Sequence, residues 1–327
     1  MPSDQSLVTL DDVQRAREVL SNSSLGVCRT PMIKNSAMFP GLENAEVYLK
    51  LENMQTTGSF KIRGVASQMA FIPDEVKRGE KKLITMSAGN YGKAFAYALN
   101  KMGLSGLCLM PLTAPSSRVQ LIKGYGVEVE QLPTSDLLSA VDKYVTEKGY
   151  TFLHSFDESN LIAGYGSASL EVLEDGVKPD VVIVCCGGGG LVSGVAATLK
   201  LSGLSDCRVY AVEPEGSPTM YESFKKGEAV TIPTVKSVAG GLSPPFAGKL
   251  TYQHCRRFVE DVVLVTDKEL VDTMAMFYKR GLVVEPSGCA AMAALINGHI
   301  PNIAGKKVVV FVTGGNVSPE EMTVHLR

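Results

Sequence analysis

Long apolar runs, blocks of basic residues and paired cysteines are all missing from this sequence of 327 residues. No apolar stretch approaches the roughly 20 residues that a membrane-spanning helix needs. The 32 basic and 34 acidic residues are interspersed, whereas a nucleic-acid-binding surface would need a basic stripe. Membrane and nucleic-acid partners are therefore not expected. The acidic N-terminal stretch lacks an apolar core, so it is not predicted to be a signal peptide.

The seven cysteines form no Cys-x-x-Cys pair, and the four histidines show no metal-ligand spacing. Cys185 and Cys186 adjoin each other within a run that predicts a buried strand. Disulfide frameworks are typical of secreted proteins. A reduced, cytoplasmic protein is therefore predicted.

The remaining composition is that of a globular protein, with 45% hydrophobic residues and 32 glycines. From residue 82 onward, strand, loop and helix patterns alternate, which is typical of parallel sheets built from βα units. A chain of this length favours two domains. We therefore predict an α/β fold of two lobes, each with a mostly parallel sheet flanked by helices. The large domain would be discontinuous, with residues 1–75 and 155–327, and the small domain would span 76–154.

The individual elements are predicted from apolar periodicity and from capping residues. Strands are expected at 46–51, 83–86, 107–110, 127–129, 181–184, 209–212 and 308–312. Helices are expected at 9–21, 60–71, 93–99, 115–122, 135–148, 163–173, 191–199, 268–278 and 288–295. The segment that begins at Arg29-Thr30-Pro31 is expected to be an extended connection, because the residue before proline avoids the α region.

Four successive glycines, Gly187 to Gly190, follow an apolar strand pattern and precede a helix pattern. In that geometry, backbone N–H groups and the helix dipole can hold a phosphate. A close strand-to-helix turn is the purely structural alternative. A nicotinamide-dependent dehydrogenase is another, because Glu213 lies where a ribose-binding acid is expected. The dinucleotide register is poor, since the third glycine comes one position late, at Gly194.

Lys61 lies between Phe60 and Ile62, directly after the turn-forming Gly58-Ser59. An apolar setting lowers the pKa of a lysine and frees its amine as a nucleophile. Together with a phosphate-binding loop, such a lysine suggests a Schiff base with pyridoxal phosphate. A lone lysine would more often be a partly exposed helix residue.

Four motifs in this order along the chain overturn that alternative: Ser59-Phe-Lys-Ile-Arg-Gly64, Ser87-Ala-Gly-Asn-Tyr-Gly92, Gly187-Gly-Gly-Gly190 and Thr313-Gly-Gly-Asn316. They resemble the signatures of the fold-type II pyridoxal phosphate enzymes, within which the serine/threonine dehydratase (ammonia-lyase) and serine racemase branch is most similar. The resemblance covers residues 10 to 320. It implies a two-lobe enzyme like the tryptophan synthase β-subunit, a small amino-acid substrate and a homodimer.

The resemblance also implies a role for each motif residue. Lys61 would hold the cofactor and take the α-proton of the substrate, with Phe60 packed beside the ring. Asn90 would hydrogen-bond the phenolic oxygen of the ring, and Thr313 would lie opposite its pyridine nitrogen. The other positions are expected at the phosphate (Gly187, Gly188, Gly189, Gly190 and Leu191), at the substrate carboxylate (Ser87, Ala88, Gly89, Asn90 and Tyr91) and at the ring edge (Gly241 and Glu285).

Thr313 bears on the reaction that is expected. A neutral hydroxyl stabilises a protonated pyridine less than an aspartate does, so the ring is a weaker electron sink. Loss of a β-hydroxyl together with the α-proton then becomes the natural route, and the enamine product hydrolyses to a 2-oxo acid and ammonia. A threonine that caps a Gly-Gly turn is the structural alternative.

Racemisation is the competing reaction, and it needs an acid or base on each face of the cofactor. In the racemases, as the resemblance has it, a serine of the carboxylate loop serves the second face. Ala88 matches that serine here, and a methyl group carries no proton. An L-threonine/L-serine dehydratase is therefore predicted, with a racemase acting through Ser87 as the alternative. The Lys-Ile-Arg sequence at Lys61 argues against the β-replacement branches, which tend to Lys-Asp-Arg.

Three positions depart from the pattern of the family. Tyr91 stands where a histidine is common, and Gly240 stands where many relatives have an aspartate. The divalent-cation site of the racemase branch would here consist of Glu213 and Ser217, with Thr219 in place of the second acid. Loss of a carboxylate weakens a site for Mg²⁺ or Ca²⁺, and Glu215 is the alternative for the second acid.

Overall fold

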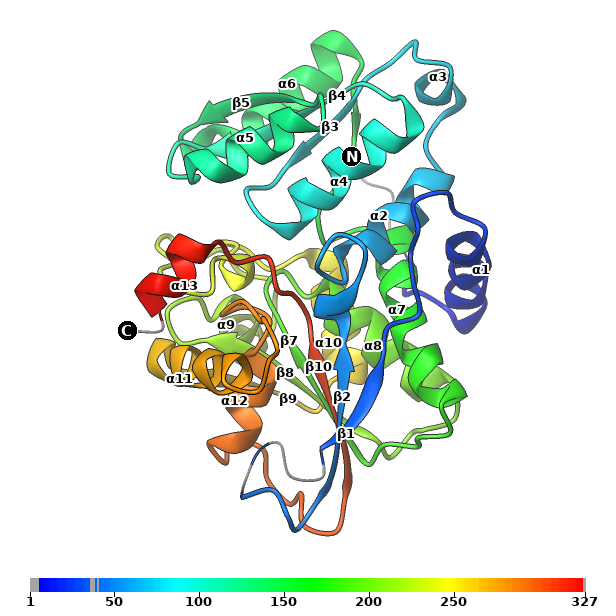
Figure 1. Cartoon of the computed structure of the whole chain (residues 1–327). Coiled ribbons are helices and arrows are strands. Elements are labelled where there is room, and N and C mark those ends of the chain that lie inside the picture. Colours follow the sequence, from blue (N-terminus) through cyan, green and yellow to red (C-terminus); the bar gives the residue numbers. More distant parts are fainter. Residues whose placement is uncertain (1–5, 36–38, 40, 326–327) are drawn as a thin grey trace.

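Two parallel-sheet regions flanked by helices make up the computed structural model, which describes residues 6–35, 39 and 41–325 (Figure 1). The larger sheet has the strand order β1-β2-β10-β7-β8-β9, and the smaller has the order β5-β4-β3-β6. All neighbouring strands run parallel except β1 and β2. The predicted α/β class with two mostly parallel sheets is confirmed.

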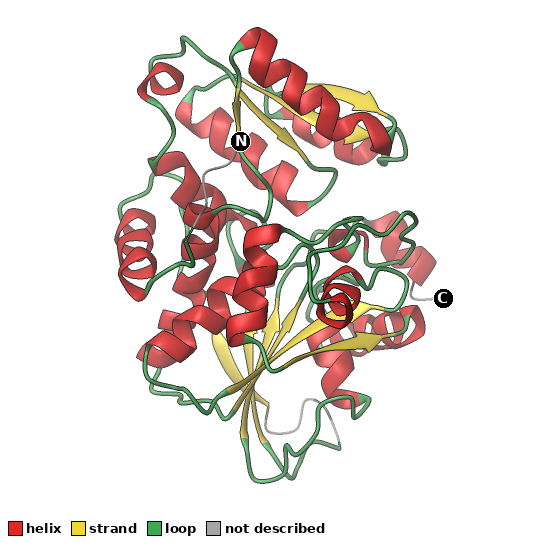
Figure 2. Cartoon of the chain, turned by 180° about the vertical axis from the view of Figure 1, so that it is seen from behind, coloured by secondary structure: helices red, strands yellow, loops and turns green. Residues whose placement is uncertain are grey.

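The larger sheet contains β1 (Met32–Asn35), β2 (Glu46–Leu51), β7 (Val181–Cys185), β8 (Arg208–Pro214), β9 (Asp261–Val265) and β10 (Lys307–Val312). Around it lie α1 (Leu10–Ser21), α2 (Lys61–Ala70), α7 (Ser159–Glu174), α8 (Gly190–Leu201), α9 (Thr219–Lys226), α10 (Lys249–Phe258), α11 (Asp267–Tyr278), α12 (Ala290–Ile296) and α13 (Pro319–His325). Helices cover both faces of this sheet, which is plain when the chain is seen from behind (Figure 2).

Coverage on both faces explains why the central strands are continuous apolar runs rather than alternating ones. Val182 and Val184 of β7 pack into the hydrophobic cluster that contains residues of α1, α7 and α8. Val181 and Ile183 of the same strand pack into the cluster on the opposite face, with residues of α11 and α12.

The smaller sheet contains β3 (Leu83–Met86), β4 (Gly106–Pro111), β5 (Glu128–Leu132) and β6 (Thr151–Phe152). The helices near it are α3 (Asp74–Lys77), α4 (Asn90–Met102), α5 (Ser116–Gly124) and α6 (Leu137–Lys148). Short 3₁₀ helices lie at Glu52–Met54, Thr134–Asp136 and Gly240–Leu242. One hydrophobic cluster contains Phe95 of α4 as well as Val65 of α2, so packing is continuous between the two sheet regions.

Most predicted elements are present, with boundaries that differ by a few residues. The helix predicted from residue 9 begins at Leu10, because Thr9 caps it by accepting a hydrogen bond from the N–H of Asp12 at 3.2 Å. The segment after Pro31 is extended as predicted, but its pairing with β2 as the strand β1 was not predicted. The prediction also missed α3, β6, α9, α10, β9 and α13. The boundaries of the two domains stay a prediction, because membership of a sheet does not set them.

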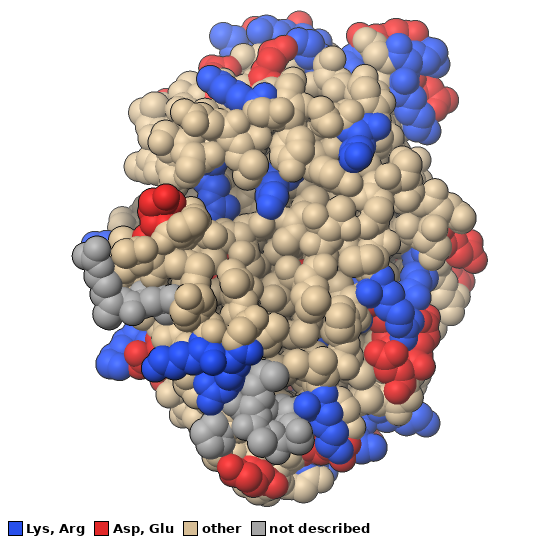
Figure 3. Space-filling view, in the orientation of Figure 1, with Lys and Arg blue, Asp and Glu red and all other residues tan. Residues whose placement is uncertain are grey.

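No helix in the described ranges is long and apolar enough to cross a membrane. On the face shown in Figure 3, basic and acidic side chains are interspersed at the periphery, and uncharged residues form most of the centre.

A buried ionic cluster fixes the start of α2. Arg63 is 1% exposed and donates to Glu52 at 2.8 Å and to Glu171 at 2.7 Å. Lys50 of β2 also donates to Glu171, at 2.5 Å. The cluster thereby ties α2 to β2 and to α7. Since Arg63 lies two residues after Lys61, it also sets the position of that lysine.

Removal of Arg63 should therefore destabilise the fold strongly. An Arg63→Met variant would leave two buried carboxylates without their main partner, and breaking a buried pair in this way costs about 3–5 kcal/mol. Chemical denaturation measures the difference. As a control, Arg78→Met breaks only the surface pair with Glu80 and should leave the unfolding midpoint unchanged. Equal midpoints for the two variants would contradict this account.

Candidate active site

Three of the predicted segments, those of Lys61, Gly187 and Thr313, come together at the carboxyl ends of three adjacent strands of the larger sheet, β2, β10 and β7, and the predicted carboxylate loop follows β3 of the smaller sheet. Lys61 begins the helix that follows β2, the glycine loop from Gly187 follows β7, and Thr313 follows β10. The N–H of Phe60 donates to the carbonyl of Thr313 at 3.1 Å, which joins the first of these segments to the third. Ligands of open α/β sheets bind at this edge.

Three aromatic rings surround the amine of Lys61. Its Nζ lies 4.9 Å from the ring centre of Phe60, 5.5 Å from that of Tyr165 and 5.9 Å from that of Tyr91. The Nζ donates one hydrogen bond, to the carbonyl of Ser155 at 3.2 Å. No ion pair to Lys61 is found among the described residues. Loss of hydration lowers the pKa of Lys61 to about 8.

The glycine loop is a cradle of free backbone N–H groups. Within the part of the chain that the structure describes, the N–H groups from Gly187 to Val192 donate to no protein acceptor. Most of them are buried at the start of α8, where unpaired N–H groups are rare unless a ligand accepts from them. Gly189 has φ +94°, and a side chain at Gly188 would overlap the ring of Phe156. An anion such as a phosphate fits this cradle.

The loop before α4 forms a second cradle. Ser87 Oγ accepts hydrogen bonds from the N–H groups of Gly89, at 3.3 Å, and Gly92, at 3.1 Å. Among the described residues, no acceptor is found for the N–H groups of Ala88 and Asn90. These groups lie at the N-terminus of a 13-residue helix, which favours an anion. A carboxylate therefore suits this loop.

Asn90 belongs to a hydrogen-bonded chain that sequence reasoning only partly identified. Its Nδ2 donates to Glu285, and its Oδ1 accepts from Asn316 at 2.8 Å. Lys93 and Arg118 in turn donate to Asn316, at 2.6 and 2.8 Å. Burial raises the pKa of Glu285 to about 7. Burial and then the charge of Arg118 lower the pKa of Lys93.

Of these residues, the sequence analysis assigned roles only to Asn90 and Glu285. Asn316 ends the Thr-Gly-Gly-Asn motif, and that position was the available signal. Lys93 lies three residues after Asn90 and therefore on the same face of α4. Nothing local marked Arg118.

Thr313 and Gly241 each make one hydrogen bond to the side chain of another residue. Thr313 Oγ1 lies 3.0 Å from Cys185 Sγ, and the N–H of Thr313 donates to the carbonyl of Gly288. The N–H of Gly241 donates to Ser287 Oγ at 3.0 Å. A side chain at Gly241 would press on Ser287. The hydroxyl of Thr313 is thus held by a thiol rather than by a carboxylate.

The two departures at Tyr91 and Gly240 have different consequences. Tyr91 is buried, and its hydroxyl donates to Gln68 at 2.6 Å, so the ring forms a wall beside Lys61. The amide of Gln68 donates to the carbonyl of His154. A Cβ added at Gly240 would meet no atom within 4 Å, so the space that an aspartate would need is open.

Glu213 has a structural function in α9. Its oxygens accept from the N–H groups of Met220 and Tyr221, both at 2.8 Å, and from Thr219 Oγ1 at 3.1 Å. Burial raises its pKa to about 8. No cluster of three or more His, Cys, Asp or Glu in the described ranges is arranged to hold a metal. Metal binding at Glu213 and Ser217 stays a prediction. A role for Glu213 at a ribose is also disfavoured, because the chain itself uses its oxygens.

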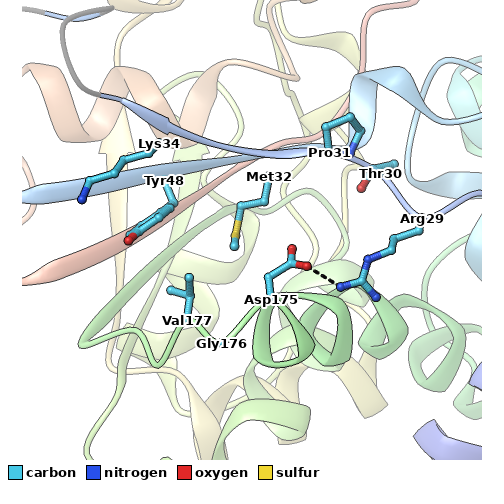
Figure 4. Close-up of a pocket in the computed structure, with 9 residues that line it drawn as sticks. All are labelled: Arg29, Thr30, Pro31, Met32, Lys34, Tyr48, Asp175, Gly176 and Val177. Atoms are coloured by element: carbon cyan, nitrogen blue, oxygen red, sulfur yellow. Dashed lines mark hydrogen bonds and ion pairs between the residues drawn. The ribbon is translucent and has the colours of Figure 1, made fainter.

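A separate cavity of about 620 Å³ lies at the β1 edge of the larger sheet, next to the end of α7 (Figure 4). It contains none of the predicted site residues. Arg29 and Asp175 form an ion pair at its rim. The lining residues are Arg29, Thr30, Pro31, Met32, Lys34, Tyr48, Asp175, Gly176 and Val177.

The cradle at the glycine loop leads to a direct prediction. Gly188→Ala should weaken binding of pyridoxal phosphate by about tenfold or more, because the new methyl group overlaps Phe156 and displaces the N–H groups. Equilibrium binding to the purified chain measures this. Gly124→Ala has open space around it and should bind as the unmodified chain does. Unchanged affinity in Gly188→Ala would contradict the assignment of the cradle.

The residues present fit pyridoxal phosphate. Lys61 has a lowered pKa, the glycine loop offers free N–H groups for the phosphate, and Asn90 and Thr313 offer polar side chains for the ring. Three comparisons with known proteins agree. The chain is 34% identical to the catabolic L-threonine dehydratase TdcB of Staphylococcus aureus, over 95% of this chain and 90% of that protein. It is 31% identical to an L-threonine ammonia-lyase of Thermotoga maritima, over 95% of this chain and 76% of that protein.

Solved structures give the same result. The serine racemase of Dictyostelium discoideum superposes with a TM-score of 0.84 at 31% identity, covering 96% of this chain and all of that one. Maize serine racemase superposes with a TM-score of 0.88 at 30% identity, and the alignment covers 98% of each chain. The family model described as "Pyridoxal-phosphate dependent enzyme" matches residues 23–314. The chain therefore belongs to the family of pyridoxal-phosphate-dependent enzymes, with the two-sheet fold of type II.

Proposed function

We propose that this chain is an ammonia-lyase (dehydratase) that converts L-threonine or L-serine to a 2-oxo acid and ammonia. One observation carries the proposal: the amine of Lys61 is enclosed by aromatic rings, without an acidic partner among the described residues, beside a cradle of free N–H groups. The similarity to threonine dehydratases over 95% of the chain supports it.

Each group of site residues has a separate role in the proposed reaction. Lys61 would hold the cofactor and, as a free amine, would take the α-proton of the substrate, because its neutral form is available near pH 8. The free N–H groups of Ala88 and Asn90 hold the substrate carboxylate. When bound, the cofactor supplies a ring that withdraws electrons from the α-carbon of the substrate. The electrons of the Cα–H bond form a Cα=Cβ bond, while the β-hydroxyl leaves with the electrons of the Cβ–O bond and takes up a proton to become water. Water then hydrolyses the resulting enamine to the 2-oxo acid and ammonia.

Racemisation of serine is the second candidate, and the serine racemase structures at 30–31% identity favour it. It needs a proton donor on the face opposite Lys61. Ala88 offers none, and Ser87 Oγ accepts two backbone hydrogen bonds that hold the loop. These contacts favour a structural function for Ser87. Elimination therefore remains the main proposal.

The setting of the enzyme is also a proposal. All seven cysteines are free thiols in the structure, which supports a reducing, cytoplasmic location. The resemblance to the family supports a homodimer.

Release of 2-oxo acid from L-threonine and L-serine tests the proposal. The cofactor-loaded chain should release it from at least one of the two, and Lys61→Ala should reduce the rate about a thousandfold or more, because the general base is lost. Lys82→Ala is the matched control, since Lys82 pairs with Glu128 at the surface. If a loaded chain only converts L-serine to D-serine, chiral analysis of the recovered serine would favour the racemase instead.

The lowered pKa of Lys61 predicts a pH profile for cofactor loading. Neutral amine is the reactive form, and it rises with pH until the pKa of about 8 is passed. The rate of loading of the cofactor-free chain should therefore level off above about pH 8, whereas the reaction of free acetyl-lysine should keep rising toward about pH 10.4. Stopped-flow absorbance gives both profiles. A chain profile that rises in parallel with acetyl-lysine would show that Lys61 is not desolvated.

A further inference from the structure

The hydroxyl of Thr313 has one hydrogen-bond partner in the described part of the chain, the thiol of Cys185 at 3.0 Å. Both residues are buried, with exposed fractions of 2% and 4%. They meet because β7 and β10 are parallel neighbours that end at the same edge of the sheet. Cys185 is the last residue of β7, and Thr313 directly follows β10. None of the motifs in the sequence included this cysteine.

The direction of this hydrogen bond follows from the two groups. Either atom could donate. Sulfur is the weaker acceptor of the two, so donation from the thiol to the hydroxyl oxygen is favoured. Burial raises the pKa of Cys185 to about 11, although the hydrogen bond to Thr313 and the charge of Lys61 lower it. The thiol therefore keeps its proton at neutral pH and can donate it.

A donating thiol determines what Thr313 offers to a ligand. The hydroxyl has one hydrogen atom, and that hydrogen stays free when its oxygen accepts from Cys185. An unprotonated pyridine nitrogen is an acceptor that this free O–H can satisfy. In the reverse orientation, the hydrogen would point to sulfur and only lone pairs would face the ring. A short chain of two hydrogen bonds also polarises its members in the same direction.

We propose that Cys185 is a positioning residue that orients the hydroxyl of Thr313 to donate to the pyridine nitrogen of the cofactor. This inference rests on the proposed function, because it assumes that the cofactor binds with its nitrogen at Thr313. It extends that function by adding a residue that acts through Thr313 and does not touch the substrate. The ring nitrogen is thereby kept unprotonated, which favours elimination over reactions that need a long-lived carbanion.

Variants at Cys185 test the proposal through cofactor binding and through the absorption band of the bound cofactor. Cys185→Ala and Cys185→Val both remove the donor, and the valine also fills the space of the thiol. Each should weaken cofactor binding about three- to tenfold and shift the absorption band, because one buried hydrogen bond is lost. Cys185→Ser keeps a donor and should restore both properties toward those of the unmodified chain.

Two controls separate orientation from simple packing. Cys289→Ala removes a thiol from the same hydrophobic cluster, where it contacts the carbonyls of Leu270 and Pro286, and should change neither property. In a Thr313→Ala background, Cys185→Val should have no further effect, because the group that it orients is gone. An effect of Cys185→Val of equal size in both backgrounds would overturn the proposal.

The failure of this inference differs from the failure of the proposed function. If the unmodified chain does not bind the cofactor, the proposed function is wrong and this inference falls with it. If the unmodified chain binds it and Cys185→Val matches that chain in affinity and absorption, only the role of Cys185 is refuted. A Cys185→Ser variant as impaired as Cys185→Val would also refute it.

Discussion

The amine of Lys61 is surrounded by three aromatic rings and has no acidic partner in the described structure, and the rest of the site depends on this constraint. A lysine in that position is costly as an ammonium ion, so its equilibrium shifts toward the neutral amine. The three rings around the amine come from separate elements: Phe60 from the turn before α2, Tyr91 from α4 and Tyr165 from α7. Because α4 belongs to the smaller sheet region, the reactivity of Lys61 requires both sheet regions to be in place.

The same constraint explains how the site attracts anions. Lys61 reacts as the neutral amine, and in that form it offers no charge to a phosphate or a carboxylate. Backbone N–H groups at two helix termini are suited to hold such anions instead. The start of α8 offers one set of unpaired N–H groups and the start of α4 the other. Asn316, in the segment after β10, accepts hydrogen bonds from Lys93 of α4 and from Arg118 of α5 near the smaller sheet. The two sheet regions are therefore joined beside the site by hydrogen bonds from these two charged side chains, and Lys61 takes no part in them.

Part of this arrangement follows directly from the sequence. The glycine run after an apolar strand and the lysine between Phe60 and Ile62 are local signals, and parallel strands place both at one edge of a sheet. Elements with weak local patterns were missed: α10 is strongly polar, and β1 is defined by its pairing with β2. Contacts between distant segments were also not predictable. Cys185 and Thr313 are 128 residues apart, and only the strand order β10-β7 brings them together.

Identification of the residue that bonds covalently to the cofactor tests the central claim most directly. The loaded chain is reduced with borohydride, which makes that bond permanent, and is then digested and analysed by peptide mass spectrometry. The desolvated amine predicts that the cofactor is recovered on the peptide that contains Lys61. Recovery on a different lysine, such as Lys93, or on no peptide at all would contradict the account.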